Sequence, residues 1–398
     1  MRKRIFQAGK ARKGQLHGHK LWCIMVMLVC LVFLASCGLS KENRDVLKVD
    51  EDISPELTYD GREELQYAKE FALDYYNDYT LISISDGSRF LVVPEGAKVP
   101  EQLDQDIVII ERPLDKVYLV ASAVMDMFRA LDEVPAVRLS GTNADGWYIE
   151  EAKSAMEQGE ILYAGKYSAP DYELILEQGC RLAVENTMIT HAPEVKEKLQ
   201  SFGISVLVDH SSYETHPMGR VEWIRLYGAL LGKEREALEI FQQQEQEIAE
   251  AVSSDQKEKT VAFFYITANG SVNVRKTSDY IPKMIELAGG RYIFDDLGSD
   301  DSHSTSMTMQ MEEFYAAARE ADYLIYNSSI DGEVESLEEL LAKSSLLKDF
   351  NAVQKGEVFC TTKNLYQESM SIGRMIRDIH LMLMGEKEEN MQYLYRLE

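Results

Sequence analysis

The chain has 398 residues, of which 45% are hydrophobic and 27% are charged, and its formal net charge at pH 7 is -25. This length and composition can supply an ordinary buried core, and the length alone favours two domains. The acidic balance disfavours nucleic acid and anionic lipid headgroups as partners, because both repel a protein of the same charge sign.

The first 36 residues have the pattern of a secretory signal. Seven Lys or Arg residues and no Asp or Glu occur in residues 1–20, and an uncharged apolar run follows from Leu21 to Leu34. This run is shorter than the roughly 20 apolar residues that a membrane-spanning helix needs. We therefore predict a signal peptide over residues 1–36. Its removal leaves 35 Lys and Arg against 67 Asp and Glu, which is a net charge of -32.

The four residues at the end of this signal, Leu34-Ala35-Ser36-Cys37, resemble the bacterial lipobox, whose cysteine is diacylated and becomes the first mature residue. The resemblance implies lipidation of Cys37 and an extracytoplasmic protein anchored to the cell membrane. The polar segment 37–60 is predicted to be a flexible tether. Cys180 and Cys360 lie in apolar stretches, so we expect two buried small side chains, although a disulfide between them stays open.

Short strand patterns then alternate with helical patterns, which favours βαβ units and a largely parallel sheet. The predicted strands of this part are Thr80–Ser85, Arg89–Val93, Asp106–Ile110, Val117–Val120, Ala136–Leu139, Ile161–Tyr163, Leu182–Glu185 and Ile204–Val208. The predicted helices are Ala123–Leu131, Ile149–Gln158, Asp171–Glu177 and Ala192–Phe202.

A long helical stretch separates this part from a second one. An amphipathic helix is predicted over Arg220–Leu231, with a break at Gly232 and a second helix over Lys233–Val252. Strand patterns restart after it at Thr260–Thr267, Ser271–Lys276, Tyr323–Asn327 and Glu357–Thr361. The helical patterns among them are Asp279–Leu287, Gln310–Arg319, Leu337–Leu347 and Ile372–Met384.

The predicted fold is therefore α/β, with two Rossmann-like lobes that have central parallel sheets and are joined by one long rigid helix. We expect the N-terminal lobe over residues 61–232, the connecting helix over 233–256 and the C-terminal lobe over 257–398.

Common catalytic motifs do not fit this sequence. The segment from Gly228 to Glu234 resembles a P-loop, but three residues separate its glycines instead of four, and Glu replaces the Ser or Thr that reaches magnesium. The sequence has no Gly-x-Ser-x-Gly elbow and no His-Glu-x-x-His. We therefore predict that the protein is not an enzyme. A lipid-anchored enzyme or adhesion module on the same two-lobe body stays as an alternative.

Three segments resemble the helical-backbone class of solute-binding proteins, which serve ABC importers of iron-siderophores, haem and cobalamin. They are Glu222–Ala237 with its Glu-Trp-Ile start and its glycines, Tyr280–Gly290, and Asp322–Ile325. The resemblance implies an iron-chelate ligand, which would be a siderophore, haem or a corrinoid. The protein would capture it between the lobes, deliver it to a permease and have no cofactor of its own.

The same resemblance implies one exposed glutamate on each lobe that meets arginine residues of the permease. The matching positions are Glu173 in the first lobe and Glu312 in the second, with Glu313 as an open alternative. A carboxylate in the first turn of a helix also complements the helix dipole, so simple helix stabilisation is the competing interpretation.

Ligand contacts are expected from loops that follow the carboxyl ends of the strands. The candidates in the first lobe are Ser122, Trp147, Tyr148, Asn186, Thr187, Ser212 and Tyr213. Those in the second lobe are Tyr265, Asn269, Arg275, Tyr280, Asn327 and Tyr366. Aromatic and amide groups suit a large flat chelate, and Arg275 could neutralise an anionic one.

One alternative is a receptor for zinc or manganese ions. His210 and His216 would be its first metal ligands, together with Glu214. Direct metal capture needs three or four converging His and carboxylate ligands. A haem receptor would need an axial ligand, for which Met307, Met309 or a histidine could serve.

Overall fold

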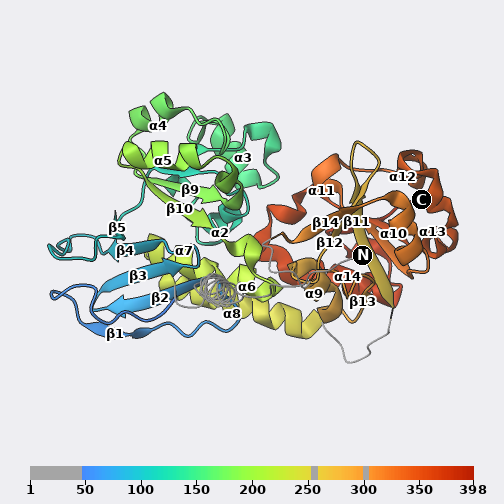
Figure 1. The fold of residues 1–398 in the computed structure, drawn as a ribbon, viewed down its shortest axis with the longest axis horizontal. Helices are drawn as coiled ribbons and strands as arrows, with labels where there is room; N and C mark the ends of the chain where they lie inside the picture. The colour runs from blue at the N-terminus through green and yellow to red at the C-terminus, as the bar shows by residue number, and fades with distance from the viewer. Residues whose placement is uncertain (1–46, 252–258, 299–303) are drawn as a thin grey trace, which may run out of the picture. The chain divides into compact units, whose positions relative to one another are not determined.

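Figure 1 shows the protein as a computed structural model that describes residues 47–251, 259–298 and 304–398. The predicted signal peptide 1–36 and the predicted lipidation site Cys37 lie outside these residues. From Val49 to Glu398 the chain forms one unit. Within the described ranges, no helix is both long enough and apolar enough to cross a membrane.

The first sheet is an antiparallel meander with one parallel strand added at its edge. Its strands are β1 (Tyr59–Arg62), β2 (Phe71–Tyr76), β3 (Tyr79–Ile84), β4 (Arg89–Val93) and β5 (Ile107–Glu111). Three of them were predicted, but a largely parallel βαβ sheet is not what they form, since only β4 and β5 are parallel neighbours. Only Asn77 and Asp78 link β2 to β3, and so short a link can only join antiparallel strands.

The segment before β1 packs against this sheet. Ile53 is 1% exposed and joins a small core with Tyr76, Leu81 and Leu91. The predicted tether 37–60 therefore does not extend to Asp60, because its last part belongs to the folded unit. A single buried isoleucine in a polar stretch has no periodicity that could have indicated this packing.

The second sheet is fully parallel and has the order β10-β9-β6-β7-β8. Its strands are β6 (Val117–Leu119), β7 (Val137–Ser140), β8 (Leu162–Tyr163), β9 (Leu182–Asn186) and β10 (Ser205–Asp209). The helices between these strands are α2 (Val124–Ala130), α3 (Glu150–Glu157), α4 (Tyr172–Gln178) and α5 (Pro193–Ser201). This alternation confirms the predicted βαβ units of the first lobe.

Three helices lead from the first lobe to the second. They are α6 (Pro217–Glu222), α7 (Ile224–Leu231) and α8 (Glu234–Ala251). The predicted single helix over Arg220–Leu231 is interrupted at Trp223, and α7 ends at Gly232, which has a φ of +75°. A left-handed residue at this position commonly ends a helix, and glycine adopts it at little cost.

Two buried carboxylates attach the first sheet to these helices. Glu222 accepts hydrogen bonds from the backbone N–H groups of Gln66, Tyr67 and Ala68, at 2.7–2.8 Å. Glu214 accepts from the N–H groups of Lys69 and Glu70 and from Nε1 of the buried Trp223. Glu222 and Glu214 therefore hold the loop between β1 and β2, and Trp223 binds Glu214.

The third sheet forms the second lobe, which begins at Lys259, and has the order β14-β12-β11-β15-β16-β17, with β13 also paired to β11. Its strands are β11 (Thr260–Ile266), β12 (Val272–Arg275), β13 (Arg291–Tyr292), β14 (Ser306–Met309), β15 (Tyr323–Tyr326), β16 (Val358–Thr361) and β17 (Leu394–Arg396). The strands β11, β13, β15 and β16 are mutually parallel, and β12 and β17 run antiparallel to them. The edge strand β14 pairs antiparallel with β12.

Helices cover this sheet, and the sequence predicted all of the described ones except two short helices, Ser328–Asp331 and Asn351–Lys355. They are α9 (Tyr280–Leu287), α10 (Met311–Ala318), α11 (Ser328–Asp331), α12 (Leu337–Lys343), α13 (Asn351–Lys355) and α14 (Ile372–Met384). The helix predicted over Leu337–Leu347 ends at Lys343, and a 3-10 turn over Ser345–Asp349 follows it. The predicted fold class, two α/β lobes joined by a long helix, is confirmed.

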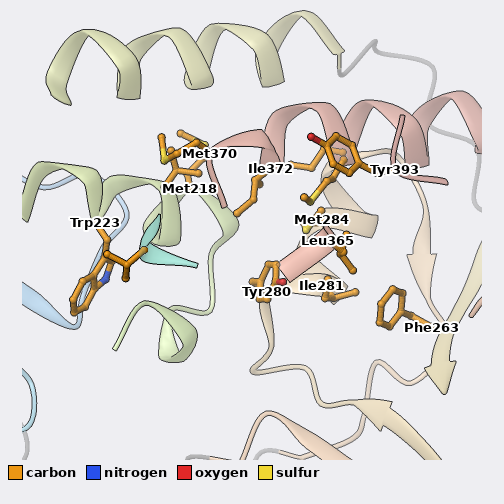
Figure 2. Packing of buried hydrophobic residues seen from close by; sticks show 14 of the residues in the cluster. Met218, Trp223, Phe263, Tyr280, Ile281, Met284, Leu365, Met370, Ile372 and Tyr393 are labelled. Carbon is orange, nitrogen blue, oxygen red and sulfur yellow. The ribbon is translucent and has the colours of Figure 1, made fainter. Parts of the chain in front are cut away.

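One apolar core runs from the first lobe through the connecting helices into the second. Figure 2 shows Met218 of α6 beside Met370, and Tyr280 and Met284 on α9. Trp223 packs edge-on against Phe71, with ring centroids 4.9 Å apart. Cys180 and Cys360 are both buried free thiols, as expected for small core side chains.

Gly228 allows the close approach of α7 and α8. A Cβ atom at this position would lie 2.5 Å from Cβ of Ala237 and 3.0 Å from the carbonyl oxygen of Lys233. We expect Gly228→Ala to lower the free energy of unfolding by roughly 1–3 kcal/mol, because the methyl group must push the two helices apart. Urea unfolding measures this difference.

The matched control is Gly373→Ala in α14, where the nearest atoms lie at an ordinary contact distance of 3.4 Å. Alanine is the better helix former, so this variant should be neutral or more stable by up to about 1 kcal/mol. Equal stability of the two variants would contradict the role assigned to Gly228.

Glu185 on β9 is a fully buried carboxyl group. Neither of its side-chain oxygens has a hydrogen-bond partner in the part of the chain that the structure describes. Burial disfavours the charged form and raises the pKa of Glu185 from 4.5 to about 8. The folded protein therefore holds a proton here at pH values where the unfolded chain has released it.

We predict that the free energy of unfolding falls as the pH rises from about 5 to 8, and that Glu185→Gln makes this fall clearly smaller, while other buried carboxyl groups such as Glu214 keep part of it. The folded-state pKa lies above the unfolded one, so ionisation in this window costs the folded state alone, by on the order of 3–5 kcal/mol in total. Urea unfolding at several pH values compares the two proteins. Parallel pH profiles would contradict the assignment.

Candidate functional site

A cleft with a volume of about 390 Å³ is lined by residues of both lobes. In the first lobe its wall is formed just beyond the carboxyl ends of β6, β9 and β10, by Ser122, Asn186 and Ser212 among others. The ends of parallel strands place successive loops along one edge of a sheet, which is where α/β proteins usually bind ligands. The cleft is therefore the candidate ligand site.

Six of the predicted ligand contacts line this cleft. They are Ser122, Asn186, Ser212, Arg275, Tyr280 and Tyr366. Asn327 lies directly behind them, since its buried Nδ2 donates to the hydroxyl of Tyr366 at 2.9 Å. It positions Tyr366 and does not form part of the wall.

The other predicted contacts lie outside the cleft wall. Trp147 is a core residue whose Nε1 donates to Oγ of Ser140 at 3.2 Å, and Tyr148 is 42% exposed elsewhere on the first lobe. The remaining ones are Thr187 at the start of a 3-10 turn, Tyr213 packed on His210, Tyr265 on β11 and Asn269 in the β11–β12 turn.

Sequence reasoning missed nine residues of the wall. They are Ala121, Ala123, Met188, Asp209, Ser211, Arg220, Asp279, Thr305 and Ile330. Most of them are neighbours of predicted residues at strand ends, so wider loop windows would have included them. Arg220 is different, because it lies on helix α6 and its position in the sequence suggested only the polar side of an amphipathic helix.

Arg275 is held rigidly in the wall by two partners. Its Nη2 donates to the hydroxyl of Tyr366, and its Nη1 lies 3.6 Å from Oδ2 of Asp279. Burial alone would lower the pKa of Arg275, but Tyr366 and Asp279 outweigh it and the pKa is raised. The guanidinium is therefore charged and already compensated by a carboxylate.

Arg220 reaches the same cleft from the first lobe. Its side chain is buried, with 7% of the residue exposed, and its guanidinium carbon lies 4.1 Å from the ring centroid of Tyr280, across the boundary between the lobes. Its buried Nε has no hydrogen-bond partner among residues 47–251, 259–298 and 304–398.

Asp209 is a buried acid in the wall with its own hydrogen bonds. Its Oδ1 accepts from the backbone N–H and hydroxyl of Ser211, and its Oδ2 accepts from the hydroxyl of Tyr227 at 2.7 Å. Burial raises the pKa of Asp209, and these hydrogen bonds oppose the increase. The carboxyl group thus fixes the end of β10 against α7.

The three residues considered as zinc or manganese ligands, His210, His216 and Glu214, do not form a metal site. Nδ1 of His210 lies 3.1 Å from Oγ of Ser85, and Nδ1 of His216 accepts from the N–H of Met218 at the start of α6. Glu214 binds backbone N–H groups and Trp223, as described above. Among the described residues, no three His, Cys, Asp or Glu side chains gather in a metal-binding arrangement.

The two methionines considered as haem ligands also lie away from the wall. Met307 and Met309 are on β14, where Met309 is buried and Met307 packs against the same core. Neither lines the cleft.

A segment next to Tyr366 ties the two lobes together. The amide of Gln367 accepts from the N–H of Tyr148 at 2.9 Å and donates to the carbonyl oxygen of Gly146 at 2.7 Å. Oγ of Ser369 donates to the carbonyl oxygen of Ala123, and the N–H of Met370 donates to the buried Asp126, both at 2.7 Å. These bonds flank the cleft and limit how far it can open.

The two predicted docking glutamates are exposed in first turns of helices. Glu173 lies in the first turn of α4, whose N-cap Asp171 accepts from the N–H of Leu174 at 3.1 Å. Glu312 lies in the first turn of α10, beside the equally exposed Glu313. Both positions leave the carboxylates available to a partner.

Comparison with known proteins supports this architecture. A sequence model described as periplasmic binding protein matches residues 120–365, which is more than half of the chain. An uncharacterized lipoprotein of Methanocaldococcus jannaschii is 25% identical over 334 residues, which are 76% of this chain and 77% of that protein. A second uncharacterized lipoprotein of the same organism is 23% identical over 95% of this chain and its own full length.

Solved structures share the fold at low identity. A protein of an ABC-type Fe3+-hydroxamate transport system from Saccharomonospora viridis has a TM-score of 0.55 and 20% identity, and covers 69% of this chain and 94% of its own. The periplasmic haem-binding protein HutB of Vibrio cholerae has a TM-score of 0.55 and 15% identity, over 67% and 98%. With two α/β lobes joined by one long helix, the chain belongs to the periplasmic binding protein family, in its helical-backbone class.

Proposed function

We propose that the protein is a lipid-anchored, extracytoplasmic receptor that captures an iron chelate in the cleft and delivers it to an ABC importer. The observation that carries this proposal is the cleft itself. It combines the aromatic rings of Tyr280 and Tyr366 with two arginines from opposite lobes, the buried Arg220 and the part-buried Arg275. Flat or aromatic chelates stack on tyrosine rings, and anionic ones are attracted by guanidinium groups.

The relatives support the same class of ligand. Two of the structures named above are described as a ferric hydroxamate transport protein and a haem-binding protein. Lipid anchoring at Cys37 is supported by the lipobox and by the lipoprotein relatives. We infer that the ligand is a siderophore, haem or a corrinoid, and that the protein has no catalytic step of its own.

Calorimetric titration of the chain from Gly38 onward tests the ligand class. We expect one ferric hydroxamate, ferric catecholate, haemin or cobalamin to bind with a Kd below about 1 µM, while zinc and manganese salts give no heat. Arg275→Gln should weaken an anionic chelate at least about tenfold. Arg291→Gln, an exposed arginine paired with Asp295, serves as its control and should bind normally.

Binding of bare metal ions would contradict the proposal. Saturable binding of bare zinc or manganese, with no response to any of the four chelates, would overturn the iron-chelate assignment.

Delivery requires a docking surface, which we propose to include Glu173 and Glu312. Charge reversal at either position should leave chelate affinity unchanged and reduce chelate-stimulated ATPase activity of the reconstituted importer at least about tenfold, because each carboxylate would lose an arginine partner and gain a repulsion. Vesicles that contain the importer give this readout.

Two charge reversals on the same helices serve as controls. Glu177→Arg on α4 should have little effect, and Glu313→Arg decides which of the two adjacent glutamates on α10 docks. If Glu173→Arg and Glu312→Arg stimulate the importer as well as the unmodified protein does, the docking assignment is wrong.

A further inference from the structure

Arg220 is a buried cation without a carboxylate partner in the described part of the chain. Its Nε lacks a hydrogen-bond partner there, and its recorded neighbour is the ring face of Tyr280. Other buried arginines differ in this respect. Arg225, five residues further on and 8% exposed, has its Nη2 2.6 Å from Oε1 of Glu63.

A buried charge is costly unless an opposite charge or several hydrogen bonds compensate it. Stacking on Tyr280 offsets part of this cost, since a cation is attracted to the face of an aromatic ring. Asp209 in the same wall accepts hydrogen bonds from Ser211 and Tyr227, and the charge of Arg220 attracts it, but the two side chains do not form an ion pair in contact. Among the described residues, Arg220 is therefore a positive charge in the cleft wall that no carboxylate contacts directly, and Asp209 offsets it only from a distance.

The other residues of the wall indicate what kind of ligand could neutralise the charge of Arg220. Arg275 is already paired with Asp279, so Arg220 supplies the less compensated charge. Met188 from the first lobe and Ile330 from the second are 46% and 55% exposed, and both line the cleft. An occupant would thus meet a cation at depth and apolar side chains at the rim.

We propose that Arg220 is the anion anchor of this cleft, and that it binds a carboxylate-type oxyanion carried by an organic ligand with an apolar flank. This inference rests on the proposed function for the role of the cleft, but it concerns the charge and polarity of the ligand and not its iron. The ligand's oxyanion takes the free donors of the guanidinium, while Tyr280 keeps the guanidinium plane in place from the opposite lobe.

Thermal unfolding of the complete chain, with Cys37→Ser in every sample, tests the anchor with simple probes. Benzoate is an apolar carboxylate, benzamide is its neutral counterpart of similar shape, and acetate is a carboxylate without the ring. We expect benzoate at about ten times its Kd to raise Tm by roughly 1–3 °C, acetate to act less, and benzamide to act little. Arg220→Met should abolish the response to benzoate.

The stability of the empty protein distinguishes an anchor from a structural arginine. Arg220→Met removes the buried charge and keeps an unbranched side chain beside Tyr280, so its Tm should equal or exceed that of the parent protein. Arg225→Met, the matched control, leaves Glu63 without its partner and should lower Tm by roughly 2–5 °C while the benzoate response persists.

Three outcomes would overturn the proposal. They are an equal effect of benzoate and benzamide, a benzoate response that survives in Arg220→Met, and a loss of Tm in Arg220→Met as large as in Arg225→Met. If acetate and benzoate had equal effects, the part of the proposal that gives the ligand an apolar flank would be wrong. Because these probes contain no iron, they test the role of Arg220 independently of the chelate titration.

Discussion

The contact between two buried carboxylates and one loop determines how the whole first lobe is built. Glu222 and Glu214 accept the N–H groups of residues 66–70, which would otherwise be unpaired backbone donors. Hydrogen bonds to a charged acceptor are among the stronger ones in proteins, and loss of the whole set would leave buried carboxylate oxygens and backbone donors unsatisfied. Burial raises the pKa of Glu214 to about 7 although the hydrogen bonds from Trp223, Glu70 and Lys69 oppose the increase, so the ionised carboxylate depends on the loop that it holds.

This attachment also fixes the position of the ligand cleft. Helix α6 has Glu222 at its end, which holds the antiparallel sheet, and Arg220 two residues earlier, which reaches the cleft. The same helix packs on α8 and α9, so a movement of the first sheet would be transmitted to the cleft wall. With Gln367 and Ser369 bonded across the lobes, the structure favours a cleft of nearly constant width over one that opens widely.

Most strands and helices of the parallel second sheet and of the mixed third sheet could be predicted, because short apolar runs alternate with amphipathic ones. The antiparallel sheet could not be placed, although three of its strands were recognised, since strand direction depends on the two-residue link at Asn77 and on tertiary pairing. Ser122, Asn186 and Ser212 were found because they follow strands directly. Trp147 was predicted as a ligand contact but is buried and does not line the cleft, because an aromatic residue after a strand looks the same in sequence whether it lines a cleft or fills a core.

Net charge is a poor guide to this cleft. The predicted mature chain has a formal charge of -32, which by itself would argue against an anionic ligand. Exposed carboxylates are screened over about 8 Å at physiological ionic strength, whereas a buried guanidinium acts on an occupant at contact distance with little screening. The acidic surface therefore lowers the association rate of an anionic ligand more than its affinity, and the arginines in the wall determine that affinity.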